Sequence, residues 1–398
     1  MNHVVWLANN LTHYHRARAD AFARVCPQGF TVLELSNSDS FSALRSAPCE
    51  KASVRTLFPG QELQKLRRSS IRNAVIRFLD EVNPSVCCLN GWALPGTAVM
   101  LSWAIRHRVP CVLMSETNGH DSPSTWWKEA IKRAFVAYCG AALVGGAWHR
   151  DYLTSLGMLP EKIFNGYDVV DNHHFQTGAE AARKDPDRTR ASLNLPSDYF
   201  LACARFEPKK NLHRLIEGYG AYVRQIGPHP WKLVIAGDGP LRPELEELTK
   251  SQRLEDQVLF RGAVGYQELP AYYGLAKAFV HASTTEQWGL VVNEAMAAGL
   301  PVLVSQRCGC VSELVKDGTN GFTFDPGKVD EITEKLVQMH RDPLMLQSMS
   351  EQSLGLIMSW GPERFARNLQ QAIQLAVDCT PRNRRSLSAV VVRLMAVH

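Results

Sequence analysis

Residues 278–305 read AFVHASTTEQWGLVVNEAMAAGLPVLVS, and this segment indicates the fold class. An apolar run at 278–282 is followed by a polar loop and then by a helical pattern. Gly299 and Pro301 end that pattern, and a second apolar run follows at 302–304. Strand, loop, helix and strand in this order form the repeating unit of a parallel α/β sheet. The stretch therefore predicts an α/β protein built on parallel sheets.

Two carboxylates in this stretch, Glu286 and Glu294, stand on either side of a glycine turn at Gly289. Parallel α/β sheets bind ligands at the carboxyl ends of their strands, beside the helix N-termini. A helix rises ~1.5 Å per residue, so the two carboxylates can lie roughly 10 Å apart along one ligand. That separation suits a nucleotide sugar, which has hydroxyl groups at both ends and a diphosphate between them. The alternative is that both glutamates are solvated or capping charges.

Apolar runs and helical patterns alternate along the whole chain, in two sets. Strands are expected at 4–8, 30–35, 86–89, 109–114 and 141–144, and again at 199–204, 232–236, 258–261, 278–282 and 302–304. Helices are expected between them, at 16–25, 71–82 and 98–106 for example. We therefore expect two Rossmann-like domains, at 1–177 and 197–361, joined by a polar linker at 178–196. Residues 362–398 would add a last helix, at 362–377, and a basic and apolar tail.

Composition bounds the class of protein. The chain has 398 residues, of which 45% are hydrophobic and 21% charged, as in ordinary globular proteins. It contains no apolar run of the ~20 residues that a membrane span needs, and its first residues lack the pattern of a signal peptide. The ten cysteines have no zinc or disulfide spacing. These features favour a cytoplasmic protein. Peripheral binding at the inner face of the membrane is compatible with that location.

The net charge of +5 is unevenly distributed, with the basic excess in the N-terminal domain and the tail. One cluster, which we call the basic cluster, consists of Lys65, Arg67, Arg68, Arg72 and Arg77. At helical spacing it could face an anionic membrane or a phosphorylated acceptor, and the alternative is a solvated helix face. The tail at 387–397 is apolar, and packing on the body is favoured over membrane contact. No basic and aromatic module of a nucleic-acid-binding domain is evident.

Several further segments match one family in order, over roughly residues 160–325. The 278–305 stretch resembles the E-x7-E signature of retaining glycosyltransferases with the GT-B fold, family 4 in particular. The segment ARFEPKKN at 204–211 resembles the family's R-F-x-x-x-K-N element, and AGDGP at 236–240 resembles its G-x-G-P turn. NGYD at 165–168 is similar to the N-G-V-D segment, and Gly309 and Glu313 fall where a later glycine loop and glutamate are expected.

The resemblance implies a fold and a donor site. Two Rossmann-like domains would face each other across a cleft, with the acceptor on the N-terminal side and the nucleotide-diphosphate sugar on the C-terminal side. As in the family, the last helix, within 362–398, would cross back to the N-terminal domain. Arg205 and Lys210 follow the strand expected at 199–204 and would neutralise the diphosphate, because such a leaving group gains negative charge as its bond breaks. The diphosphate would also meet the amides of Gly289, Leu290 and Val291 at a helix N-terminus.

The resemblance also assigns roles to the carboxylates. Glu294 would bind the ribose hydroxyls, and Glu286 would bind hydroxyls of the transferred sugar. No metal and no other cofactor would be required, and the anomeric configuration would be retained by a front-face mechanism. In that mechanism the leaving phosphate helps to deprotonate the acceptor.

The acceptor side is less defined. His120 and Asp121 follow the strand expected at 109–114, where related enzymes place a histidine near the reacting sugar, with Asp121 orienting it. His15 follows the first strand, and Trp126 could provide a stacking platform for a sugar; packing roles are the alternatives. The acceptor itself could be a saccharide, a lipid-linked saccharide or a small molecule.

Other classes fit less well. A nicotinamide dehydrogenase needs G-x-G-x-x-G after its first strand, and residues 8–13 contain no glycine. A glycan phosphorylase needs a lysine that binds pyridoxal phosphate and usually a longer chain. Two alternatives stay open: a GT-B nucleotide-sugar epimerase, and a non-catalytic protein that binds nucleotide sugars. The sequence favours a glycosyltransferase because Arg205, Lys210, Glu286 and Glu294 are all present.

Overall fold

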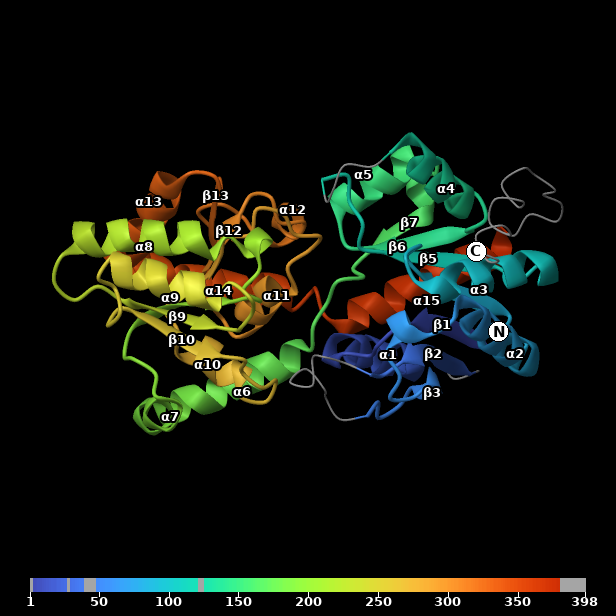
Figure 1. The fold of residues 1–398 in the computed structure, drawn as a ribbon, viewed down its shortest axis with the longest axis horizontal. Helices are drawn as coiled ribbons and strands as arrows, with labels where there is room; N and C mark the ends of the chain where they lie inside the picture. Colours follow the sequence, from blue (N-terminus) through green and yellow to red (C-terminus); the bar gives the residue numbers. More distant parts are fainter. Residues whose placement is uncertain (1–2, 27–28, 39–47, 121–124, 380–398) are drawn as a thin grey trace. The chain divides into compact units, whose positions relative to one another are not determined.

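The chain separates into two compact units, each built on its own sheet (Figure 1). The computed structural model describes residues 3–26, 29–38, 48–120 and 125–379. Unit 1 comprises the chain up to Val169 and resumes at Pro362, and unit 2 comprises Val170–Gly361. The chain thus passes between the units twice, after Val169 and after Gly361.

Unit 1 contains a parallel sheet whose described strands follow the order β3-β2-β1-β4-β5-β6-β7. The central strands are apolar on both faces, as expected for a parallel sheet covered by helices on both sides. The strands are β1 (Val4–Ala8), β2 (Phe30–Ser36), β3 (Ser53–Phe58), β4 (Val86–Asn90), β5 (Cys111–Ser115), β6 (Ala141–Val144) and β7 (Ile163–Asn165).

The α-helices of unit 1 cover this sheet, and two short 3-10 helices (η) lie in its loops. They are α1 (His13–Val25), η2 (Leu63–Lys65), α2 (Arg68–Val82), α3 (Pro95–His107), α4 (Trp126–Val136), α5 (Ala147–Ser155), η3 (Pro160–Lys162) and α15 (Pro362–Asp378). Helix α15 packs beside α1 and β6. It approaches Gly140 so closely that a Cβ there would lie 2.7 Å from the Cα of Ala376. The helix expected at 362–377 is therefore part of unit 1.

Unit 2 contains a parallel sheet whose described strands follow the order β10-β9-β8-β11-β12-β13. The order reverses between β8 and β11, which lie side by side with β9 on one flank and β12 on the other. Ligands bind at such switch points. The strands are β8 (Tyr199–Cys203), β9 (Lys232–Ala236), β10 (Val258–Gly262), β11 (Ala278–His281), β12 (Val302–Ser305) and β13 (Gly321–Phe324).

The helices of unit 2 pack on both faces of its sheet, and Figure 1 shows α6 and α10 lying together. They are α6 (Asn172–Lys184), α7 (Pro186–Leu193), η4 (Pro208–Lys210), α8 (Leu212–Ile226), α9 (Arg242–Ser251), α10 (Leu269–Leu275), α11 (Leu290–Ala297), α12 (Val311–Leu314), α13 (Val329–Arg341) and α14 (Pro343–Ile357).

The linker expected at 178–196 is helical in the structure and belongs to unit 2. Asp171 accepts a hydrogen bond from the backbone N–H of His174, and Asp185 accepts one from Arg188, so aspartates cap both α6 and α7. The polar residues that suggested a linker are the caps and exposed faces of these helices. The second domain was expected to begin at residue 197. Unit 2 instead begins at Val170, so it already includes α6 and α7.

Candidate functional site

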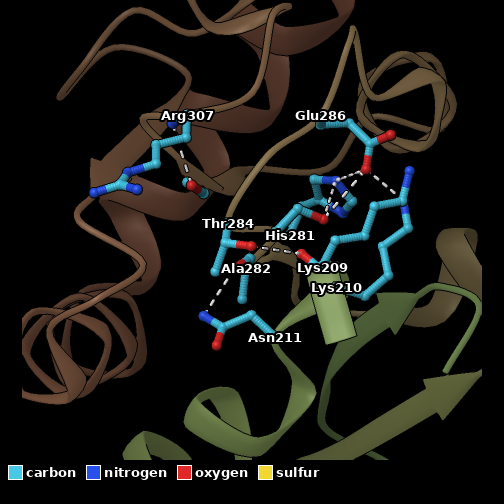
Figure 2. A network of polar contacts seen from close by, with 10 residues as sticks. Lys209, Lys210, Asn211, His281, Ala282, Thr284, Glu286 and Arg307 are labelled. Atoms are coloured by element: carbon cyan, nitrogen blue, oxygen red, sulfur yellow. Dashed lines mark hydrogen bonds and ion pairs between the residues drawn. The ribbon is translucent and has the colours of Figure 1, made fainter. Parts of the chain in front are cut away.

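The candidate site lies in unit 2, where the loops that follow β8 and β11 meet. The backbone N–H of Thr284 donates a 2.8 Å hydrogen bond to the carbonyl oxygen of Lys209. The amide of Asn211 donates to the carbonyl oxygen of Ala282 at 3.1 Å and to that of Pro326 at 2.8 Å. Figure 2 shows the contacts with Lys209 and Ala282, which connect the loops at the carboxyl ends of both strands. The switch point of the sheet therefore carries a fixed backbone frame.

Lys210 and Glu286 form an ion pair on this frame, through the Lys210 ammonium and Oε2 of the carboxylate (Figure 2). Their side chains are only 13% and 14% exposed. Two further groups approach the same oxygen: Ser283 Oγ at 3.3 Å and His281 Nε2 at 3.6 Å. The structure thus brings together Lys210 and Glu286, which were proposed from the sequence. It adds Ser283 and His281, which were not.

The electrostatics of the pair keep Glu286 ionised. Burial alone would raise the pKa of Glu286, but the contact with His281 and the charge of Lys210 outweigh it and hold that pKa well below its usual range. Burial lowers the pKa of His281, and Lys210 adds to that effect while Glu286 opposes it. At neutral pH the site therefore contains an ionised carboxylate, a lysine and a neutral imidazole.

Arg205 occupies a more exposed position in the loop after β8. Its guanidinium lies 3.0 Å from the carboxylate of Glu207, and its side chain is 51% exposed. The backbone around it is tied to the turn after β9, because the N–H of Phe206 donates a 2.9 Å hydrogen bond to the carbonyl oxygen of Asp238. A Cβ on Gly239 would lie 2.8 Å from that same Phe206 nitrogen, so only glycine fits. The G-x-G-P turn thus fixes the backbone that carries Arg205.

The N-terminus of α11 is held by a second loop. Gly289 is its N-cap, with φ of 106°, a conformation that favours glycine, and half-buried Leu290 and Val291 begin the helix. The N–H of Gly309 donates to the carbonyl oxygen of Glu286, and that of Cys310 donates to Trp288, each at 3.1 Å. The amides at this helix start are suited to an anion.

Glu294 is fully buried, which the sequence did not indicate. The hydroxyl of Tyr273, from α10, donates a 2.7 Å hydrogen bond to Oε2 of its carboxylate. Burial is the main cause of a raised pKa at Tyr273, so the phenol stays protonated and remains a donor. Tyr273 therefore fixes the orientation of Glu294 inside the unit.

Comparison with known proteins places the chain in a family. Residues 184–354 match the family described as Glycosyl transferases group 1. A mannosyltransferase of Mycobacterium tuberculosis, GDP-mannose-dependent alpha-(1-6)-phosphatidylinositol monomannoside mannosyltransferase, is 30% identical over 262 residues, covering 55% of this chain and 67% of that protein. The chain belongs to this family.

Other relatives match over a shorter part. The alpha-monoglucosyldiacylglycerol synthase of Acholeplasma laidlawii is 29% identical over 198 residues, which is 49% of this chain and 48% of that protein. The chain thus spans about half the length of that curated relative. The crystal structure of Anabaena HepE in complex with UDP and glucose superposes with a TM-score of 0.75 and 16% identity, over 94% of this chain and 100% of that chain. The expected GT-B fold class is confirmed.

The candidate acceptor residues of this group 1 family member lie in unit 1. His15 is on α1, where Nδ1 lies 2.9 Å from the hydroxyl of Thr12, and burial together with Arg18 lowers its pKa to about 3. His120 is exposed in the loop after β5, with its ring against the edge of Trp148. Trp126 begins α4 and is 83% exposed. Asp121 lies outside the described residues.

A buried charged cluster in unit 1 was not found from the sequence. The guanidinium of Arg18 lies 3.5 Å from the carboxylate of Asp168 and 3.9 Å from that of Glu116, and stacks on the ring of Tyr167. Burial, with Glu116 nearby, raises the pKa of Asp168 well above its usual range. The cluster attaches the NGYD segment to α1, and the signal for it was an arginine within the apolar face of that helix.

The remaining expectations concern the membrane and metals. The basic cluster (Lys65, Arg67, Arg68, Arg72 and Arg77) is exposed on η2, on α2 and at the N-cap residue of α2, Arg67. Among the described residues, no helix is long and apolar enough to cross a membrane. Within those same residues, no three His, Cys, Asp or Glu side chains gather in a way that could hold a metal ion. The tail at 387–397 lies outside the part of the chain that the structure describes.

Proposed function

We propose that this chain is a retaining, metal-independent glycosyltransferase that moves a sugar from a nucleotide-diphosphate donor to a saccharide, lipid-linked or small-molecule acceptor. The observation that carries the proposal is the buried Lys210–Glu286 pair at the switch point of the unit 2 sheet, beside the N-terminus of α11. A cation, an ionised carboxylate and the backbone amides of a helix N-terminus are groups that can bind a diphosphate and a sugar together.

Each group has a place in the reaction. The bond between C1 of the sugar and the phosphate oxygen breaks, and the leaving diphosphate gains negative charge. Lys210, Arg205 and the amides of Gly289, Leu290 and Val291 stabilise that charge. The acceptor oxygen forms the new bond to C1 on the same face, and its proton passes to the departing phosphate oxygen. The anomeric configuration is retained because the acceptor attacks C1 from the same face from which the diphosphate departs.

Glu286 is assigned to sugar binding rather than to nucleophilic attack. Its Oε2 already contacts Lys210, Ser283 and His281, and its pKa is held below the usual range. A carboxylate stabilised in this way is a weak nucleophile but a good acceptor for hydroxyl groups. Glu294, oriented by Tyr273, is assigned to the ribose hydroxyls.

The acceptor is assigned to unit 1, where His15, His120, Asp121 and Trp126 are the candidate contacts. Relatives are named for diacylglycerol and phosphatidylinositol substrates, which supports a lipid-linked acceptor for this chain. The exposed basic cluster would then bring the protein to an anionic membrane surface, as a peripheral protein of the cytoplasm.

The test is a transfer assay with purified protein in EDTA, followed by NMR of the product. The proposal expects full activity in EDTA and a product anomer identical to that of the donor. Inversion of the anomer would refute the retaining mechanism, and activity that Mn²⁺ alone restores would refute metal independence. HepE was crystallised with UDP and glucose, so UDP-glucose is the first donor to test.

The two alternatives predict different products. An epimerase would convert the donor into an isomeric nucleotide sugar without any acceptor. A non-catalytic protein would bind the donor and leave it intact. A transferase releases the nucleoside diphosphate, so chromatography of the nucleotide after incubation separates the three.

A further inference from the structure

His281 is the last residue of β11, and it ends an otherwise apolar strand. Its side chain is 3% exposed, and its Nε2 lies 3.6 Å from Oε2 of Glu286. Nε2 lies 3.2 Å from Ser283 Oγ, and Ser283 Oγ lies 3.3 Å from Oε2 of Glu286. A polar side chain buried in a core strand costs stability unless its hydrogen bonds are used. The contacts show that they are directed at the carboxylate.

The geometry selects one protonation state of this trio. A serine hydroxyl has one proton to donate, and the carboxylate of Glu286 can only accept. If Ser283 donates to Glu286, then Nε2 of His281 must carry a proton and donate to Ser283. The opposite tautomer would place the lone pair of Nε2 3.6 Å from the negatively charged oxygen. The neutral imidazole with a proton on Nε2 therefore satisfies both contacts.

All the contacts converge on one oxygen. Among the described residues, Lys210, Ser283 and His281 approach Oε2 of Glu286. Figure 2 shows the other oxygen of the Glu286 carboxylate, Oε1, directed away from the ring of His281. Lys210 and Ser283 donate to Oε2, and His281 orients the Ser283 hydroxyl. A carboxylate held in this way cannot rotate freely, so the direction of its second oxygen is fixed.

The geometry points to His281 and Ser283 as positioning residues that hold Glu286 so that Oε1 accepts a hydroxyl of the transferred sugar. This inference rests on the proposed function, because it assigns the sugar to Glu286. It adds that discrimination between a nucleotide sugar and the bare nucleotide depends on a serine and a histidine that themselves do not touch the sugar. Lys210, in contrast, serves both the carboxylate and the diphosphate.

The test compares binding of UDP-glucose with binding of UDP by calorimetry, and GDP-mannose with GDP if the uridine pair does not bind. Ser283→Ala and His281→Leu should weaken binding of the nucleotide sugar by about three- to tenfold, the effect of one net hydrogen bond, and leave binding of the nucleoside diphosphate unchanged. His281→Gln should recover part of the loss, because a glutamine amide can donate from about the position of Nε2.

Phe279→Leu is the matched control, since Phe279 lies on the same strand and stacks beside the His281 ring. It should alter stability without changing the ratio of the two affinities. The inference is overturned if Ser283→Ala changes both affinities equally or neither. Wild-type protein that binds no nucleotide sugar would instead remove the proposed function itself. Ser283→Ala keeps the test valid if His281→Leu does not fold.

Discussion

The hydroxyl of Tyr273 donates a 2.7 Å hydrogen bond to the fully buried carboxylate of Glu294. A buried carboxylate without a donor costs free energy, and this bond offsets that cost. The pair links α10 to α11. Tyr273, which lies outside the E-x7-E segment, therefore orients Glu294, which lies within it.

Tyr273→Phe should therefore lower the free energy of unfolding by about 1–3 kcal/mol, because it leaves the Glu294 carboxylate without this donor. It should also weaken binding of the nucleoside diphosphate. Tyr219→Phe is the control, since the Tyr219 hydroxyl donates to the carbonyl oxygen of Trp231, away from Glu294. That variant should lose stability but keep its nucleotide affinity. Equal nucleotide affinity in both variants would contradict the assigned role of Tyr273.

Lys210→Ala should reduce kcat by about 10²–10³-fold, because it removes a cation that stabilises charge on the leaving group. Arg205→Ala should act in the same direction. Lys277→Ala is the control. Lys277 immediately precedes the first residue of β11, whereas the candidate site follows its last residue, and the Lys277 ammonium lies 2.9 Å from the carboxylate of Asp198. Initial rates under saturating donor give the comparison, and unchanged turnover in Lys210→Ala would refute the site assignment.

The lowered pKa of Glu286 predicts how stability depends on pH. A carboxyl group whose pKa is lower in the folded state stabilises folding above its unfolded pKa of about 4.5 and loses that contribution as pH falls. The stability advantage of wild-type protein over Glu286→Gln should therefore be full near neutral pH and shrink in acid. Thermal unfolding of both proteins from neutral pH down to about pH 3 measures it, because the contribution begins to fall only below the unfolded pKa of about 4.5. A difference that is constant across this range would show that the Glu286 pKa is not lowered.

The basic cluster predicts binding to anionic vesicles that weakens as salt rises, since exposed charges are screened within ~10 Å at 0.1 M salt. Replacing Arg67, Arg68 and Arg72 with Gln should abolish co-sedimentation with vesicles that contain an anionic lipid. Replacing Arg188, Arg190 and Arg253 in unit 2 with Gln removes the same number of positive charges. This control should leave co-sedimentation with the vesicles unchanged. Absence of sedimentation of the wild-type protein at low salt would remove the membrane hypothesis.

Much of the fold was predictable because buried parallel strands are apolar throughout. The strands expected at 4–8, 141–144 and 232–236 match β1, β6 and β9 in both bounds. The strands that the sequence did not indicate are β3, β7 and β13, at the edges of their sheets. An edge strand such as β3, with its alternating exposed residues, lacks the continuous apolar run that identifies the central strands.

The site was predictable only where a family signature exists. Lys210 and Glu286 lie far apart in sequence, and their place in one donor site was inferred from the family resemblance rather than from any local pattern. Their ion pair was not predicted and is seen only in the folded chain. His281 and Ser283 were missed because a single polar residue at the end of an apolar strand is ambiguous. Their roles depend on which loop lies above the strand, and that is a property of the folded sheet.

Binding of nucleotide sugars to wild-type protein and to Lys210→Ala is the decisive measurement for a donor site around Lys210 and Glu286. Calorimetry with UDP-glucose, GDP-mannose, ADP-glucose and dTDP-glucose, in EDTA, covers the common donor bases. We predict that wild-type protein binds one of them more tightly than the others, and that Lys210→Ala weakens that binding at least tenfold, or about 1.4 kcal/mol. Failure of the wild-type protein to bind any of the four, or equal binding by the variant, would contradict the claim that this site holds a nucleotide-diphosphate sugar.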